Sequence, residues 1–419
     1  MPEDVRPLPI WAGRAAALIG VLLVALSLRS SVAGLSPIIN LVAKDVALNP
    51  LVLGIVGAAP PVTFALTGLA TPWLSRRLGL ERSLLLAAAL MAVGQFTRAL
   101  APDSALLVVS TVVTLVGAAI GNVLLPPIVK RYFPDRITQV TTIYAVFISL
   151  STALPALLAV PFANALGWRF SLGVWFLIAL SAIAPWTVAS VSHLRRRNAE
   201  RENPATDAVE SEPQLEARLF RSPVAWAIMI TFSISSINVY AMFAWLPSLL
   251  VTSAHVSHAG AGALLALYSI MGFPCSLLVP WLAGRMRNVG VLLYVALGVL
   301  LVGDGGLAFF PTVAPALWVA IAGLGPLLFP LSLVLINSRT RTHAGSVALS
   351  GFVQGVGYII AAISPLTFGL LEQATGTWTL SLVFLFVLSL AAVPAGIILS
   401  RGRVLEDDLA RRASRSAPR

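Results

Sequence analysis

Charged residues are scarce in this chain. Only 11% of its 419 residues are charged, whereas roughly a quarter are charged in an ordinary soluble domain. Hydrophobic residues make up 58% of the sequence, and the mean hydropathy is +0.90. Because a chain of this length has too few polar residues to cover a surface in water, its composition excludes a soluble globular protein. The sequence predicts that lipid surrounds most of the molecule.

Cysteine and lysine are also nearly absent. Cys275 is the only cysteine, which excludes a disulfide framework and a thiol-ligated metal cluster. Lys44 and Lys130 are the only lysines, and the arginines lie in short clusters between apolar runs. They form no basic face interleaved with aromatic residues. The net charge of +11 therefore indicates membrane topology rather than nucleic-acid binding.

Motifs for enzymatic chemistry are missing. The sequence has no His/Glu zinc motif, no phosphate-binding glycine loop and no nucleophile elbow. The four histidines, His193, His255, His258 and His343, all fall in predicted loops. We therefore predict no enzyme, no cofactor and no metal site, and a transport mechanism that does not use ATP.

Long apolar runs dominate what is present. A membrane span needs roughly 20 apolar residues to cross about 30 Å of hydrocarbon. Twelve runs meet this requirement, so the sequence predicts an all-α membrane protein with twelve transmembrane helices. The first run follows a short polar N-terminus and is expected to be a retained helix rather than a cleaved signal peptide. The runs lie near 15–42, 52–74, 83–101, 105–129, 138–164, 170–192, 223–252, 259–283, 289–310, 313–337, 345–371 and 378–400.

Basic residues occur in alternate loops between these runs. By the positive-inside rule, the loops that carry them are cytoplasmic. Both termini are then cytoplasmic too, as an even number of spans requires, and the chain is expected in a bacterial inner membrane. The basic residues include Arg76, Arg77, Arg82, Lys130, Arg131, Arg136, Arg195, Arg196, Arg197, Arg285, Arg287, Arg339 and Arg341.

The chain also shows an internal repeat. Residues 72–77 resemble 280–285, and residues 121–126 resemble 325–330, at nearly the same separation. Two parallel repeats of six helices are typical of transporters that bind substrate between their halves, near the middle of the bilayer. The predicted division is a six-helix bundle at 1–192, a cytoplasmic linker at 193–221, a second bundle at 222–400 and a cytoplasmic tail at 401–419.

Arg29 lies midway along the first span. A cation at the centre of a membrane helix costs about 2.5–3.5 kcal/mol, and arginine cannot relieve that cost by losing its proton. Arg29 therefore needs a wet cavity, a carboxylate or an anionic ligand. We expect it to face the substrate, and a buried ion pair is the alternative, for which Asp304 is the only acid well inside a span. A planar guanidinium suits a small carboxylate or a nitro group.

Neutral polar residues within other apolar spans are further candidates for contact with substrate. For each of them, hydrogen bonding between helices is the alternative. Gln354 and Tyr358 are four residues apart and so share one helix face, and Trp245 is placed to stack on a planar solute. The full candidate set is Arg29, Asn122, Tyr144, Asn238, Tyr240, Trp245, Gln354 and Tyr358.

Three charged residues near or within spans have competing interpretations. Asp304, flanked by two glycines, either couples protons or has a structural role. Arg98 and Arg169 lie at the outer ends of their spans, where we expect their side chains to extend to the interface. An alternative for both arginines is to attract anions to the outer mouth.

Four segments together resemble the cyanate and nitroimidazole porter branch of the major facilitator superfamily. They are residues 28–37, residues 121–126 with 130–134, residues 238–247, and residues 351–358 with Pro365. The resemblance implies alternating access and small solutes that are often anionic or nitroaromatic. It would place six of the candidate residues around a central cavity, namely Arg29, Asn122, Asn238, Tyr240, Gln354 and Tyr358.

The sequence departs from the superfamily pattern at two places. The loop after the second span, residues 71–79, lacks the usual acid before Arg76 and Arg77, so the usual gating salt bridge is in doubt. Arg76, Arg77 and Arg285 remain candidates for gating. The fifth span carries residues 151–155 where many proton-driven drug exporters have a glycine–proline pattern, which argues against that class.

The function predicted from the sequence is secondary active transport of a small, anionic organic solute by alternating access. Its partners would be the solute, with or without a co-transported proton, and the lipid bilayer, and the protein would be a monomer. The alternative is an exporter of hydrophobic drugs or nitroaromatic compounds. A membrane sensor or a membrane-embedded enzyme is disfavoured, because the chain shows neither a signalling domain nor catalytic residues.

Overall fold

The computed structural model describes residues 14–48, 50–202, 219–286 and 288–408, and within these ranges the regular structure is entirely helical. Twelve helical segments in this part of the chain are long and apolar enough to cross a membrane. The prediction of an all-α protein with twelve membrane spans is therefore confirmed.

The first bundle contains the elements up to Glu202. Their order follows the predicted spans, and Asp103 caps α6 by accepting a hydrogen bond from the backbone N–H of Leu106 at 2.8 Å. The elements are α1 (Ala15–Ser27), α2 (Ser30–Ala33), η1 (Ser36–Ile38), α3 (Ile39–Val42), α4 (Pro50–Leu78), α5 (Leu80–Ala99), α6 (Ser104–Tyr132), α7 (Ile137–Leu166), α8 (Trp168–Gly173) and α9 (Phe176–Glu202).

The second bundle contains the elements from Pro223 onward. Side chains of Ser222, Ser257, Asn288 and Thr342 cap the helices that follow them. The elements are α11 (Pro223–Ser253), α12 (His258–Arg285), α13 (Val289–Phe309), α14 (Pro315–Gly323), η2 (Gly325–Leu327), α15 (Leu328–Ser338), α16 (His343–Thr375), α17 (Trp378–Ser389) and α18 (Ala392–Ser400).

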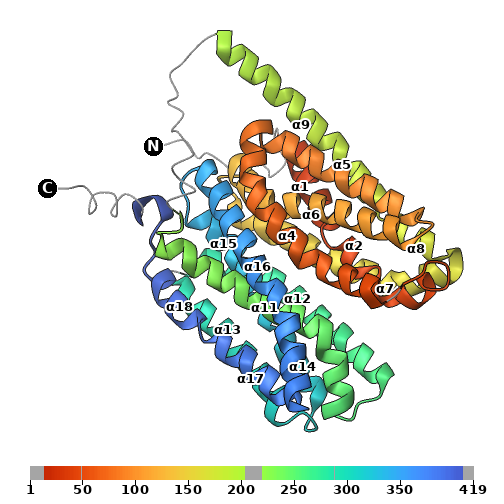
Figure 1. Cartoon of the computed structure of the whole chain (residues 1–419). Helices are drawn as coiled ribbons and strands as arrows, with labels where there is room; N and C mark the ends of the chain where they lie inside the picture. Colours follow the sequence, from red (N-terminus) through yellow and green to blue (C-terminus); the bar gives the residue numbers. More distant parts are fainter. Residues whose placement is uncertain (1–13, 49, 203–218, 287, 409–419) are drawn as a thin grey trace.

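The two bundles lie side by side (Figure 1). Helices α4, α6 and α7 of the first bundle contact α12, α15 and α16 of the second. We call one end of the molecule the basic end, because the loops and helix ends there carry Arg76, Arg77, Lys130, Arg131, Arg285, Arg339 and Arg341. The other end is the opposite end.

Several spans are not continuous helices. The run predicted at 15–42 breaks at Leu28 and Arg29, between α1 and α2, and then continues as short turns. The tenth span is interrupted at Leu324 by the 3-10 turn η2. A break exposes backbone groups that a continuous helix would pair internally, and inside a membrane protein such a break is tolerated only where protein or a wet cavity surrounds it.

The predicted linker differs from the structure at its beginning. Helix α9 continues past Ser192 to Glu202, and residues 203–218 of the predicted linker lie outside the described residues. The prediction that all four histidines lie in loops is wrong, because His193 falls within α9 and His258 and His343 begin α12 and α16. Only His255 lies in a loop.

Candidate functional site

Arg29 lies between the two bundles, at the break in the first span. Its backbone N–H donates to the hydroxyl of Ser151 in α7 at 3.2 Å. Its guanidinium carbon lies 5.2 Å from the ring centroid of Phe64 in α4 and 5.7 Å from that of Phe329 in α15. Its Nη2 donates to the hydroxyl of Tyr358 in α16 at 3.2 Å. Residues of both bundles therefore hold this cation, through aromatic faces and a hydroxyl group.

The alternative ion pair between Arg29 and Asp304 is not formed. Asp304 is buried in α13, inside the second bundle, and neither of its carboxyl oxygens has a hydrogen-bond partner in the described part of the chain. The ion pairs among the described residues do not include Arg29. Its charge is therefore balanced by no carboxylate within those ranges.

A cluster of amides beside Arg29 joins the two bundles. Asn122 of α6 donates from Nδ2 to Oε1 of Gln354 at 2.5 Å and to the hydroxyl of Tyr358 at 3.2 Å. Gln354 donates from Nε2 to the backbone carbonyl of Asn122 at 3.2 Å and to the hydroxyl of Ser350 at 2.9 Å. Ser350 in turn donates to the carbonyl of Val123 at 2.7 Å. Three of the predicted site residues, Asn122, Gln354 and Tyr358, thus meet at one place.

Aromatic rings surround the ring of Tyr358. Its ring stacks on Phe64 with the centroids 5.0 Å apart, and it meets Phe232 of α11 edge to face at 4.9 Å. The ring centroid of Tyr240 lies 6.2 Å from that of Tyr358, and the hydroxyl of Tyr240 interacts with Arg29. The hydroxyl of Tyr240 is buried without a hydrogen-bond partner of good geometry among the described residues. The arrangement offers a cation with tyrosine hydroxyls beside it and aromatic walls, which can bind a small planar anion.

The other predicted site residues make contacts within a single bundle. Tyr144 is fully buried in α7. Asn238 donates from Nδ2 to the carbonyl of Ile234 at 3.1 Å and to the hydroxyl of Ser389 at 3.3 Å. Trp245 donates from Nε1 to the carbonyl of Pro365 at 2.8 Å. Their direct contact with a substrate stays a prediction.

The phenylalanines of the site could not be found from the sequence. Phe64, Phe232 and Phe329 lie in apolar spans, where an aromatic residue is the ordinary filling of a bundle. Only the fold brings Phe64 and Phe329 from different bundles to the same guanidinium.

Lys130 joins the two bundles at the basic end. The sequence placed it in a loop cluster, but it lies in the last turn of α6 and is only 7% exposed. Its Nζ donates to the carbonyl of Asn337 at 3.1 Å and to the hydroxyl of Thr340 at 2.7 Å, and it also contacts the carbonyl of Thr340. These groups lie at the C-terminal end of α15, where carbonyls lack helical partners and attract a cation. In the sequence, Lys130 is distinguished by its residue type, because nearly all other basic residues of the chain are arginines.

Two of the three predicted gating arginines, Arg77 and Arg285, stack on tryptophans of their own helices. Arg77 lies 4.4 Å from the ring centroid of Trp73, and Arg285 lies 4.0 Å from that of Trp281. These pairs occupy corresponding positions in the two halves. Arg76 lines a pocket between the bundles at the basic end. The role of all three in gating stays a prediction.

Glu81 provides a buried carboxylate at the basic end. It lies at the start of α5 and accepts a hydrogen bond from the hydroxyl of Tyr132 at 2.8 Å, while Arg131 approaches it to 3.3 Å. It is 2% exposed. This network lies within the first bundle, so it braces α5 against α6.

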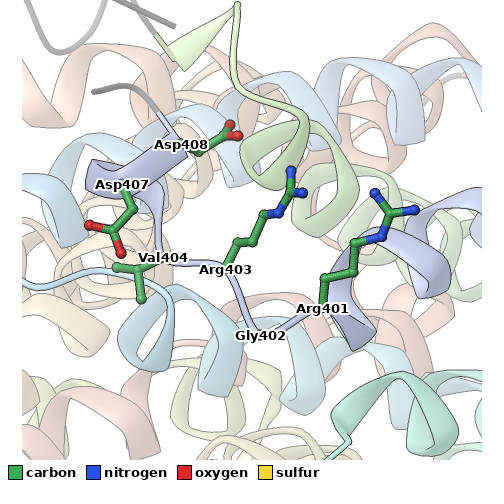
Figure 2. Close-up of a pocket in the computed structure, with 6 residues that line it drawn as sticks. All are labelled: Arg401, Gly402, Arg403, Val404, Asp407 and Asp408. Carbon is green, nitrogen blue, oxygen red and sulfur yellow. The ribbon is translucent and has the colours of Figure 1, made fainter. Parts of the chain in front are cut away.

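A second pocket at the basic end lies in the segment after α18, which provides all of its lining residues. Figure 2 shows Arg401 and Arg403 pointing the same way and Asp407 pointing away from them. Asp408 accepts from the hydroxyl of Ser222 at 2.8 Å, which ties the segment to the start of α11. This pocket belongs to the second bundle alone. Within the described ranges, no three His, Cys, Asp or Glu side chains gather closely enough to hold a metal ion.

Helices α4 and α16 cross closely near the basic end and part toward the opposite end. A Cβ added to Gly68 would lie 3.0 Å from the Cα of Gly355, and one added to Gly351 would meet the ring of Pro72. On the same helix faces nearer the opposite end, a Cβ on Gly57 would meet nothing within 4 Å, and Leu366 is 69% exposed. The structure is therefore closed at the basic end.

The two arginines predicted to reach the outer interface differ. Arg169 is exposed and pairs with Asp45 at 3.0 Å. Hydrogen bonds from Trp168 and Arg169 hold the pKa of Asp45 below its usual value. Arg98 is 2% exposed and turns into the first bundle, so the prediction that it extends to the interface is wrong. Arg98 lies on the side of α5 that faces the interior of the first bundle, so its side chain points inward.

Comparison with known proteins agrees with this architecture. The family profile described as Major Facilitator Superfamily matches residues 18–365. The chain is 32% identical over 389 residues to the 2-nitroimidazole transporter of Escherichia coli (strain K12), covering 92% of this chain and 95% of that protein. It is 28% identical over 370 residues to the cyanate transport protein CynX of the same organism, covering 88% and 92%.

Solved structures show the same fold. The proton:xylose symporter XylE superposes with a TM-score of 0.68 at 14% identity, covering 96% of this chain and 98% of that chain. The Escherichia coli fucose:proton symporter FucP superposes with a TM-score of 0.64 at 13% identity, covering 92% and 98%. With two six-span bundles, a central polar site and relatives that are transporters, the chain belongs to the Major Facilitator Superfamily, in the branch of the cyanate and 2-nitroimidazole transporters.

Proposed function

We propose that this transporter moves a small, planar anionic or nitro-bearing organic solute across a bacterial inner membrane, and that Arg29 recognises the solute. The observation that carries the proposal is the guanidinium of Arg29, held between Phe64 and Phe329 with no carboxylate partner among the described residues. A half-buried cation without a counter-charge attracts an anion into its site. The basic end is cytoplasmic in this proposal, by the positive-inside rule.

The walls of the site support a planar substrate. The rings of Phe64, Phe232 and Tyr240 surround Tyr358, and such faces stack on flat solutes while excluding water. A guanidinium binds the two oxygens of a carboxylate or a nitro group through paired N–H donors. The relatives support the same class, because their names refer to cyanate and to a 2-nitroimidazole.

Alternating access supplies the route. The bundles are closed at the basic end by Lys130 and by the crossing of Gly68 with Gly355. A solute reaches Arg29 from the opposite end, and the bundles then rock so that the basic end opens. Because no acid contacts Arg29 in the described part of the chain, a coupled proton would travel on the solute itself.

Uptake into proteoliposomes tests the proposal. The wild-type protein should accumulate one or more members of a panel of small planar anions, such as cyanate, benzoate and nitroimidazoles, with or without an inward proton gradient. Arg29→Gln should abolish uptake, and Arg29→Lys should keep only part of it because the paired donors are lost. Arg169→Gln is the matched control, since Arg169 is exposed at the opposite end, and it should transport like the wild type.

Two results would remove Arg29 from this role. One is uptake that survives Arg29→Gln in a protein that still folds, as judged by its elution and its thermal unfolding. The other is a substrate profile restricted to neutral or cationic compounds. In either case, the dependence of uptake on the proton gradient shows whether transport is coupled to protons.

Export of nitroaromatic compounds is the second candidate function. It is favoured by the aromatic walls of the site and by the similarity to a 2-nitroimidazole transporter. Transport into everted vesicles separates it from import. Accumulation of a nitroimidazole in everted but not in right-side-out vesicles would establish export.

A further inference from the structure

Arg98 has two hydrogen-bond donors that are buried and unused. It lies one residue before the end of α5, and its Nη1 donates to the carbonyl of Ser31 at 2.7 Å. Its Nε and Nη2 have no partner among the described residues, and the residue is 2% exposed. In the planar guanidinium, the N–H groups of Nε and Nη2 form one edge. That edge is the paired fork with which arginine binds oxyanions.

The nearby acids are committed to other groups. Asp45 accepts hydrogen bonds from Trp168 and Arg169, and Asp103 caps the first turn of α6. The ion pairs among the described residues do not include Arg98. Arginine stays protonated in proteins, so Arg98 cannot relieve its burial by becoming neutral. An isolated charge inside a bundle is costly, and a charged partner of opposite sign removes most of that cost.

Other unused donors lie around the same segment of the first span. The hydroxyl of Ser31 and the indole N–H of Trp175 are both buried without partners in the described ranges. A Cβ built on Gly34 would lie 3.1 Å from the carbonyl of Ser30 and 3.9 Å from Nε1 of Trp175, which places the indole beside this segment. Gln95, one turn before Arg98, donates to the hydroxyl of Ser30 at 3.2 Å. Arg98 and Trp175 thus both lie beside residues 30–34, which include the unpartnered hydroxyl of Ser31.

We propose that Arg98, with Ser31 and Trp175, binds a small monovalent anion inside the first bundle, at a site separate from Arg29. The ligand is a planar oxyanion or a halide, because the site offers donors and a positive charge. Its source is either an inorganic anion of the medium or the transported solute. A bound anion would also brace the broken helix, because Arg98 and Gln95 hold the two residues that follow Arg29.

Anion-dependent stability of the purified full-length protein in lipid nanodiscs tests this site. Thermal unfolding is followed in sodium gluconate, with chloride, nitrate, bromide or benzoate replacing gluconate at constant ionic strength. The wild-type unfolding midpoint should rise by several degrees with a saturable dependence on the small anion. Arg29→Gln and the exposed control Arg169→Gln should keep this dependence, whereas the double variant Arg29→Gln/Arg98→Gln should lose it.

A second pair of variants covers the case in which Arg29→Gln/Arg98→Gln does not fold. Trp175→Phe and Ser31→Ala each remove one donor and little volume, and each should raise the half-saturating anion concentration by about tenfold, which corresponds to one hydrogen bond to a charged ligand. Saturation by chloride or nitrate identifies an inorganic anion, and saturation by benzoate alone identifies a solute-like carboxylate.

Three results would overturn the proposal. They are an unfolding midpoint that is the same in all anions, an anion dependence that survives in Arg29→Gln/Arg98→Gln or keeps the same half-saturating concentration in both donor variants, and a dependence that disappears in Arg29→Gln. The last result would assign the anion to Arg29 instead. Because anion binding is measured in a protein that lacks Arg29, the result does not depend on whether the transport proposal holds.

Discussion

Removing the amine of Lys130 should open the basic end. Its Nζ makes hydrogen bonds to Asn337 and Thr340 of the other bundle, and these exist only while that end is closed. A hydrogen bond that involves a charged group contributes about 1.5–3 kcal/mol. Taking about 2 kcal/mol for the loss in Lys130→Met, we expect the ratio of open to closed molecules to rise about 30-fold.

Cysteine labelling measures this change. In a background of Cys275→Ser, a cysteine at Ala348 lies in the pocket between the bundles at the basic end and is buried in the closed structure. A membrane-impermeant maleimide applied to that side should label it about 30-fold faster in Lys130→Met, provided that labelling follows the open population. Lys44→Met is the matched control, because Lys44 is the other lysine of the chain and is exposed.

A labelling rate in Lys130→Met equal to that of the control would refute the reasoning. It would mean that water replaces the amine at the end of α15 without loss. A slower rate would also refute it, since it would show that Lys130 favours the open state.

Two further predictions concern the contacts between the bundles. Gly355→Ala should increase labelling at the basic end and reduce uptake, because the added Cβ would lie 2.6 Å from Cδ2 of Leu69 and 2.9 Å from its backbone nitrogen. Gly298→Ala is the control, because a Cβ there would meet nothing within 4 Å, and it should behave like the wild type in both assays. Asn122→Leu should lower the thermal unfolding midpoint, because it leaves the buried Oε1 of Gln354 unpaired at a cost of about 1–3 kcal/mol. The double variant Asn122→Leu/Gln354→Leu should lose less than the sum of the two single variants, and strictly additive losses would contradict this pairing.

The membrane architecture was predictable from the sequence because each span is recorded in about twenty consecutive residues. The internal repeat was predictable for a similar reason, since short segments recur at one separation. Arg29, Gln354 and Tyr358 also stood out, because a polar residue inside an apolar span needs a partner. The structure brings these three together, and it adds the contacts that hold them.

The remaining parts of the site depend on packing between distant residues. Phe64 and Phe329 carry no signal in an apolar span, although they lie against the guanidinium of Arg29. Lys130 lies at the end of a span, where a basic residue ordinarily reports topology. The direction of Arg98 depends on how α5 is rotated against its neighbours, which a single sequence does not specify. Predicting each of these features requires the relative positions of residues that are more than a hundred positions apart in the sequence or that lie on neighbouring helices.

The close crossing of α4 and α16 has a thermodynamic consequence. Gly68, Gly351, Gly355 and Pro72 lie where the two helices approach most closely, and glycine and proline side chains have essentially no rotamer freedom to lose when they are buried. Closing the basic end at this crossing therefore restricts few side-chain torsions. We expect its closure to have a small entropy cost, and its rate to follow the movement of whole helices rather than the rearrangement of side chains.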